Sequence, residues 1–254
     1  MSEIDIEKSG GVAMVTLNRP PVNSLTLALC EHISEAFEGL GTSNDVNCVV
    51  FTGAGTRAFC AGFDFQEFLE AKPEETSKRT LATRRMYSSI YNCAVPVIAA
   101  VNGPALGAGS VLASVCDIRM ASETARFGMP EINVGRCGGA AHHGRLLPQG
   151  VVRRMFFTGQ PISAVEAYRI GFLEQVLPTG ELISAAREMA AVIASKSPVG
   201  LRCGKKALNE IEDLPFEQGY AVEQAYTEKL RDTEDAKEAR RAVMEKRSPV
   251  FTGR

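Results

Sequence analysis

Short apolar runs alternate with amphipathic stretches through the first two-thirds of the chain. Four runs are apolar along most of their length and predict strands: VAMVTLN, CVVFTGAG, VPVIAAVNG and CDIRMAS. Between them, apolar residues recur every three or four positions from Ser24 to Leu40 and from Arg79 to Cys93, and a further helix is expected around Ser110 to Ser114. Ser24 is expected to cap the first helix. The alternation predicts an α/β sheet with right-handed crossover connections.

The last third of the chain has a helical pattern throughout. Helices are expected over the ranges Ala164 to Ile170, Leu182 to Ser195, Gly200 to Ile211 and Phe216 to Arg247. The last has a narrow apolar stripe of Ala236, Ala239 and Val243, so it either packs on the body or another subunit, or is a solvated charged helix.

Composition excludes several classes of protein. The chain has 254 residues, 45% hydrophobic and 23% charged, with 28 Lys and Arg against 30 Asp and Glu, so no charge excess favours nucleic acid or an anionic membrane. The apolar region from Cys93 to Cys116 is interrupted by Pro and Gly, which disfavours a transmembrane helix. The acidic start MSEIDIEKSG has no apolar signal region, so a cytoplasmic protein is expected. Seven Cys without a C-x-x-C pair and three His favour neither disulfides nor a metal site.

Two Gly-rich turns follow predicted strands, in TGAGTRAFCAGFDF and in GPALGAGS. If the strands are neighbours, the turns share the carboxyl edge of the sheet, and two converging N–H groups there would form an oxyanion hole. The second turn is not a dinucleotide fingerprint, because Leu112 occupies the third glycine position. P-loop and G-x-S-x-G motifs are absent from the sequence.

A single carboxylate stands out downstream, in the stretch FGMPEINVG. Glu131 lies among apolar residues, where desolvation would raise the pKa of its side chain toward the range of a general base. Composition alone also allows a surface or salt-bridged glutamate.

Several motifs in series resemble the enoyl-CoA hydratase/isomerase (crotonase) superfamily. They are AFCAGFD, PVIAAVNGPALGAG, CDIRMAS, FGMPEINVG, FTGQPISAVEAYRIGFLEQVLP and SKSPVGLRCGKKAL. The resemblance implies a crotonase-like spiral of repeated ββα units over residues 1–195 and a helical region over 196–254 that helps to form a homotrimer or a dimer of trimers. It also implies an acyl-CoA thioester substrate and no separate cofactor.

The resemblance assigns roles to particular positions. The oxyanion hole falls on the backbone N–H groups of Phe63 and Ala108, and one catalytic glutamate falls on Glu131. The second glutamate of hydratases falls on Val111, which cannot hold a water. One carboxylate suffices to shift a double bond, so enoyl-CoA isomerisation is the most economical activity. The loop NRPPVNSLT, which resembles that of Δ3,Δ2-enoyl-CoA isomerases, adds slight support.

Other functions stay open at this point. A hydratase or hydratase-like lyase would need a different acid, and one of His142 and His143 could face the pocket, since adjacent helical residues point about 100° apart. An NAD-dependent oxidoreductase is disfavoured by Leu112, and a non-catalytic acyl-CoA binder is a further alternative.

Substrate contacts are expected from a small set of residues: Arg57, Ala61, Asp64, Val111, Gly139 and His142. Arg57 is the first candidate for the coenzyme A phosphates, and Lys205, Lys206, Lys246 and Arg247 could add to it from the helical region or a neighbouring subunit.

Overall fold

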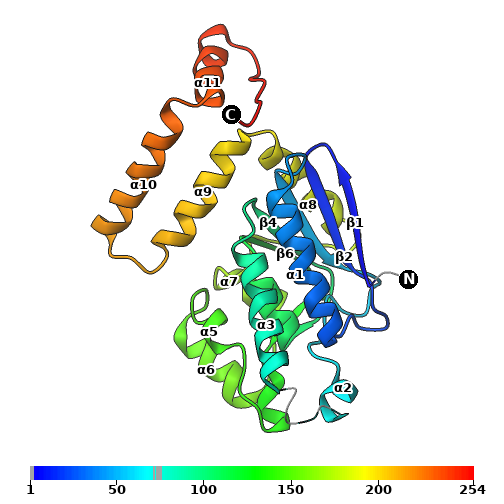
Figure 1. The fold of residues 1–254 in the computed structure, drawn as a ribbon. Coiled ribbons are helices and arrows are strands. Elements are labelled where there is room, and N and C mark those ends of the chain that lie inside the picture. Colours follow the sequence, from blue (N-terminus) through cyan, green and yellow to red (C-terminus); the bar gives the residue numbers. More distant parts are fainter. Residues whose placement is uncertain (1–2, 71, 73–75) are drawn as a thin grey trace.

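A six-stranded sheet forms the centre of the molecule in the computed structural model, which describes residues 3–70, 72 and 76–254 (Figure 1). Its strand order is β1-β2-β3-β4-β6-β9, and three short strands form a second sheet in the order β5-β7-β8. The strands are β1 (Ile4–Ser9), β2 (Val12–Leu17), β3 (Cys48–Gly53), β4 (Val97–Val101), β5 (Ala105–Leu106), β6 (Ile118–Ser122), β7 (Arg126–Gly128), β8 (Ile162–Ser163) and β9 (Gln175–Leu177).

Helices connect and cover the strands. They are α1 (Leu27–Thr42), α2 (Phe65–Glu70), α3 (Thr76–Tyr91), α4 (Ala108–Ser114), the 3₁₀ helix η2 (Pro130–Val134), α5 (Ala140–His143), α6 (Gln149–Thr158), α7 (Ala164–Arg169), α8 (Leu182–Ala194), α9 (Pro198–Ile211), α10 (Phe216–Arg231) and α11 (Glu234–Glu245).

The central strands are buried on both faces, which explains their continuous apolar sequences. In β3, Val49 and Phe51 belong to the core beneath α1 and α3, whereas Cys48 and Val50 face α8 on the other side. Strands β2, β3, β4, β6 and β9 run parallel. The predicted α/β sheet is therefore confirmed for the strands read from the sequence.

The edge strand β1 was not predicted. It pairs antiparallel with β2, from Ile4 opposite Leu17 to Ser9 opposite Val12, and most of its side chains are exposed. An exposed edge strand needs no apolar run, because its backbone hydrogen bonds to β2 hold it in place.

Two helix boundaries differ from the prediction. Thr26, not Ser24, caps α1, since its side chain accepts a hydrogen bond from the N–H of Leu29; Ser24 instead accepts one from Arg19. The expected long C-terminal helix is broken into α10 and α11, and Thr233 caps the second by accepting from the N–H of Ala236. In both places, the capping hydrogen bond of a threonine side chain determines where the helix begins.

Helices α9, α10 and α11 extend away from the sheet as a separate arm (Figure 1). Several contacts join the arm to the core. Arg202 of α9 donates to the carbonyls of Gly41, Ser43 and Val46. The buried Lys205 of α9 donates to Asp117 at 2.7 Å and to the carbonyl of Val95 at 3.1 Å. Lys205 is therefore a structural residue and is not available for a phosphate group.

Candidate active site

The two Gly-rich turns meet backbone to backbone. The N–H of Leu106 donates to the carbonyl of Cys60 at 3.0 Å, and a Cβ on Gly109 would lie only 2.1 Å from the same carbonyl oxygen. Glycine is required at position 109 because the backbone of the first turn occupies the space of a side chain. The carboxyl ends of β3 and β4 thus bring the two turns together as predicted.

The contact leaves two backbone N–H groups without an internal acceptor. Leu25 hydrogen-bonds to the carbonyl of Gly62 and to the N–H of Asp64, so the intervening N–H of Phe63 points away from Leu25. Ala108 is the first residue of α4, and a Cβ on Gly62 would lie 3.7 Å from its nitrogen. Within the described part of the chain, neither N–H has a hydrogen-bond acceptor. Two such donors side by side can hold a developing oxyanion.

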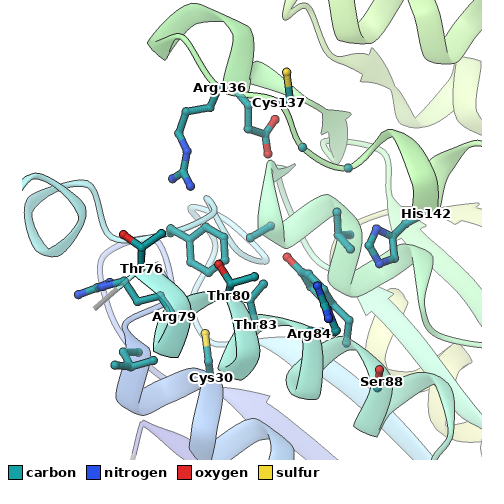
Figure 2. Close-up of a pocket in the computed structure, with 18 residues that line it drawn as sticks. Cys30, Thr76, Arg79, Thr80, Thr83, Arg84, Ser88, Arg136, Cys137 and His142 are labelled. Atoms are coloured by element: carbon teal, nitrogen blue, oxygen red, sulfur yellow. The ribbon is translucent and has the colours of Figure 1, made fainter. Parts of the chain in front are cut away.

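Both residues line a cavity of about 710 Å³ (Figure 2). Its lining joins the two turns to α1, α3, η2 and the start of α5. Of the predicted site residues, it brings together Phe63, Ala108, Val111, Glu131, Gly139 and His142.

Glu131 is held in the cavity by the short helix η2. Pro130 begins this helix and Gly135 ends it in the left-handed conformation, with φ of 70°. A Cβ on Gly107 would lie 3.0 Å from Oε1 of Glu131, and one on Gly138 would lie 3.2 Å from it, so two glycines make room for the carboxyl group. The carboxyl group therefore lies beside the turn that carries the N–H of Ala108.

The surroundings of Glu131 favour its protonated form. Its Oε2 is buried and has no hydrogen-bond partner in the described residues. Burial raises the pKa of Glu131, while a backbone hydrogen bond and the nearby charge of Arg136 act in the opposite direction. A carboxyl group with a raised pKa is better matched to proton transfer near neutral pH than an ordinary glutamate.

The two histidines have different roles, as the helical geometry predicted. His142 lines the cavity with its ring centroid 5.1 Å from that of Tyr87, and its Nδ1 is buried without a partner in the described chain. Burial and the charge of Arg145 lower the pKa of His142. It therefore presents a neutral imidazole to the cavity near pH 7.

His143 is fully buried and has both ring nitrogens occupied. Its Nδ1 lies 2.8 Å from the carbonyl oxygen of Gly139, which can only accept, so Nδ1 carries the proton. Its Nε2 then accepts from the hydroxyl of Ser110 at 2.8 Å. Burial lowers the pKa of His143 to about 4. His143 is a structural link between α4 and α5.

We expect acidification to destabilise the protein through His143. The unfolded chain binds a proton at His143 below pH ~6.5, but the folded protein does so only near pH 4. The free energy of unfolding should therefore fall as pH falls from about 6.5 toward 4, by ~2 kcal/mol between pH 7 and 5 from this residue. Urea unfolding of wild type and His143→Gln at both pH values measures it, and equal losses in the two proteins would contradict the expectation.

Three predicted substrate contacts lie outside the cavity lining: Arg57, Ala61 and Asp64. Arg57 is exposed on the loop after β3, and the N–H of Ala61 donates to the carbonyl of Val22. Asp64 accepts from the N–H of Glu67 and pairs with Arg19 at 2.8 Å, contacts that hold the pKa of Asp64 low. The carboxylate of Asp64 therefore accepts a hydrogen bond from the first turn of α2.

Sequence reasoning missed one wall of the cavity. Helix α3 contributes Arg79, Thr80, Thr83 and Arg84, and Arg136 lies across from it (Figure 2). Helix α3 packs against α1 through Met86 and Ile90, and its polar side faces the cavity. No local signal marks a polar helix face as lining a cavity.

Comparison with known proteins decides the family. The family model described as enoyl-CoA hydratase/isomerase matches residues 7–254. The chain belongs to this family. Its mixed α/β core and helical C-terminal region therefore form a crotonase fold, and the protein is an acyl-CoA enzyme of the enoyl-CoA hydratase/isomerase family.

Its relatives cover the whole chain. It is 36% identical over 251 residues to the short-chain-enoyl-CoA hydratase of Clostridium acetobutylicum, covering 97% of this chain and 96% of the relative. It is 36% identical over 260 residues to the (E)-benzylidenesuccinyl-CoA hydratase of Thauera aromatica, covering 98% and 99%. A crystal structure of an enoyl-CoA hydratase from Bacillus anthracis matches with a TM-score of 0.96 at 32% identity, covering 100% of both chains.

Membrane-spanning helices and metal-binding clusters are the two remaining features that bear on function. Among residues 3–70, 72 and 76–254, no helix combines the length and apolar character needed to cross a bilayer. In the same described residues, no group of three or more His, Cys, Asp or Glu side chains is arranged to hold a metal ion.

Proposed function

We propose that this member of the family isomerises the double bond of enoyl-CoA thioesters, with Glu131 as the single general base and acid. One observation carries the proposal: among the described residues that line the cavity, Glu131 is the only carboxylate. Val111, at the position of the second hydratase glutamate, is a buried apolar residue of the same cavity. A second carboxylate to activate water is therefore missing from the described lining.

The reaction would use the groups already described. The thioester oxygen accepts hydrogen bonds from the N–H groups of Phe63 and Ala108, and Glu131 removes a proton from C2 of a 3-enoyl thioester. The electron pair moves into a dienolate, whose oxygen carries the negative charge beside the two donors. Glu131 then returns the proton at C4, which leaves the conjugated 2-enoyl thioester. Atoms and charge balance without a cofactor beyond the coenzyme A of the substrate.

Hydration is the second candidate, and His142 is the observation that favours it. Its unpaired, buried Nδ1 offers the cavity a polar group that could orient a water in place of the missing carboxylate. The hydratase names of the relatives from Clostridium acetobutylicum and Thauera aromatica point the same way.

Product analysis separates the two candidates. Purified enzyme is incubated with trans-3-hexenoyl-CoA, and the product is followed by ultraviolet absorbance and by mass. The conjugated 2-enoyl absorbance without added mass supports isomerisation. A gain of one water shows hydration, and loss of that gain in His142→Gln would assign the missing acid to His142.

The pH profile of the reaction should reflect the raised pKa of Glu131. The base must be ionised to remove the C2 proton, so kcat/KM falls as pH falls through the pKa of Glu131 in the free enzyme. The acid limb is therefore expected above the ordinary glutamate value of ~4.3. Initial rates between pH 4 and 9 measure it, and a midpoint at or below the ordinary value would contradict this assignment.

The C-terminal arm supports the expected homotrimer or dimer of trimers as a further part of the proposal. Leu208, Phe216, Tyr220 and Val243 expose large apolar side chains along α9 to α11. Burying them against another copy of the chain would remove this apolar surface from water.

A further inference from the structure

The wall of the cavity formed by α3 is polar along its whole length. Thr76, Thr80, Thr83 and Ser88 alternate with Arg79 and Arg84 along the lining, and Tyr87 completes the face (Figure 2). From Thr76 to Ser88 this wall is about 18 Å long at the rise of an α-helix. A saturated hydrocarbon tail has no group that can hydrogen-bond to these hydroxyl and guanidinium groups, whereas a carboxylate has.

Arg84 is the cation of this wall that has no counter-ion among the residues the structure describes. Its neighbour Arg85 pairs with Glu38 at 2.7 Å, and Arg79 pairs with Glu67 at 3.0 Å. Among residues 3–70, 72 and 76–254, no hydrogen bond or ion pair is formed by the guanidinium of Arg84.

The charge of the described lining points to an anion. Three arginines, Arg79, Arg84 and Arg136, face the cavity, and Glu131 is the one carboxylate among the lining residues that the structure describes. A guanidinium with adjacent hydroxyl groups is well suited to bind a carboxylate through paired hydrogen bonds.

We propose that the acyl group of the substrate carries a carboxylate distant from the thioester, and that Arg84 binds it with the hydroxyls of Thr80 and Thr83. The substrate class is therefore a CoA monothioester of a dicarboxylic acid. This inference rests on the proposed acyl-CoA activity of the same cavity, and it names the specificity of that cavity.

The phosphates of coenzyme A are another source of the same anionic chemistry, and binding experiments separate the two. Saturated thioesters are used because they do not react, so the result does not depend on the proposed isomerisation. Glutaryl-CoA, adipoyl-CoA and suberyl-CoA are each compared with the uncharged partner of equal length: pentanoyl-CoA, hexanoyl-CoA and octanoyl-CoA. Dissociation constants are measured by titration calorimetry for wild type, Arg84→Gln and the matched control Arg85→Gln.

We expect wild type to bind the best dicarboxylic thioester about 10- to 100-fold more tightly than its uncharged partner. Arg84→Gln should abolish this preference and leave the affinity for the uncharged thioester unchanged, and Arg85→Gln should retain the preference. Equal weakening of both thioesters in Arg84→Gln would assign Arg84 to the coenzyme A phosphates and overturn the proposal. The absence of a preference for all three pairs in wild type would also overturn it.

Turnover measurements then test whether the binding preference also decides which substrate the enzyme converts. With trans-3-hexenedioyl-CoA and trans-3-hexenoyl-CoA as substrates, Arg84→Gln should lower the ratio of kcat/KM for the first to kcat/KM for the second about 10-fold or more. If neither compound reacts while the binding preference is present, the proposed reaction fails and the specificity stands. If both react equally well in wild type, the specificity fails and the reaction stands.

Discussion

Replacing Glu131 by glutamine should lower kcat for isomerisation of trans-3-hexenoyl-CoA on the order of 10³-fold or more. Glutamine keeps the size of the side chain but cannot take up the C2 proton. No other carboxylate lines the described part of the cavity, and His142 lines it from α5. Loss of the base therefore removes both proton transfers of the proposed reaction.

Binding and stability measurements keep this result interpretable. The N–H groups of Phe63 and Ala108 are unchanged in Glu131→Gln, so the dissociation constant for hexanoyl-CoA should stay within a few-fold of wild type. The variant should be at least as stable as wild type to urea, because a neutral amide replaces a carboxyl group whose ionised form is disfavoured by burial. A folded variant with undiminished isomerisation would show that Glu131 is not the base.

Replacing Gly109 by alanine should disrupt the site through the backbone. The new Cβ would lie 2.1 Å from the carbonyl oxygen and 2.8 Å from the carbonyl carbon of Cys60, a contact that neither main chain can relieve locally. We expect a loss of about 3 kcal/mol or more in the free energy of unfolding, as for severe overpacking of a core. The adjacent N–H of Ala108 would move away from that of Phe63, at a further cost of ~10²-fold or more in rate.

Gly39 provides the matched control. It lies on the exposed side of α1, and a Cβ there would meet nothing within 4 Å. Gly39→Ala should raise the free energy of unfolding by about 0.5–1 kcal/mol and leave activity unchanged. Urea unfolding and the isomerase assay on both variants test the argument, and a stable, active Gly109→Ala protein would show that the two turns need not pack this closely.

The part of the candidate site that depends on one side chain, Glu131, could be predicted from the sequence. Glu131 was identified as a carboxyl group in apolar surroundings, and the structure places it in the cavity with the expected rise in pKa. Val111 and His142 also lie where their motifs indicated. The contacts assigned to Arg57, Ala61 and Asp64 depend on the direction of a loop, and none of these three residues lines the cavity.

The sequence by itself determined the parallel strands, because burial on both faces requires apolar residues at most positions of β3 and at every position of β4. Continuous apolar runs of this kind are a local property that can be read directly. The edge strand β1 and the polar wall of α3 have no such local mark. Only the tertiary structure decided that β1 joins the sheet and that Arg84 faces a cavity, since both depend on which distant segments pack beside them.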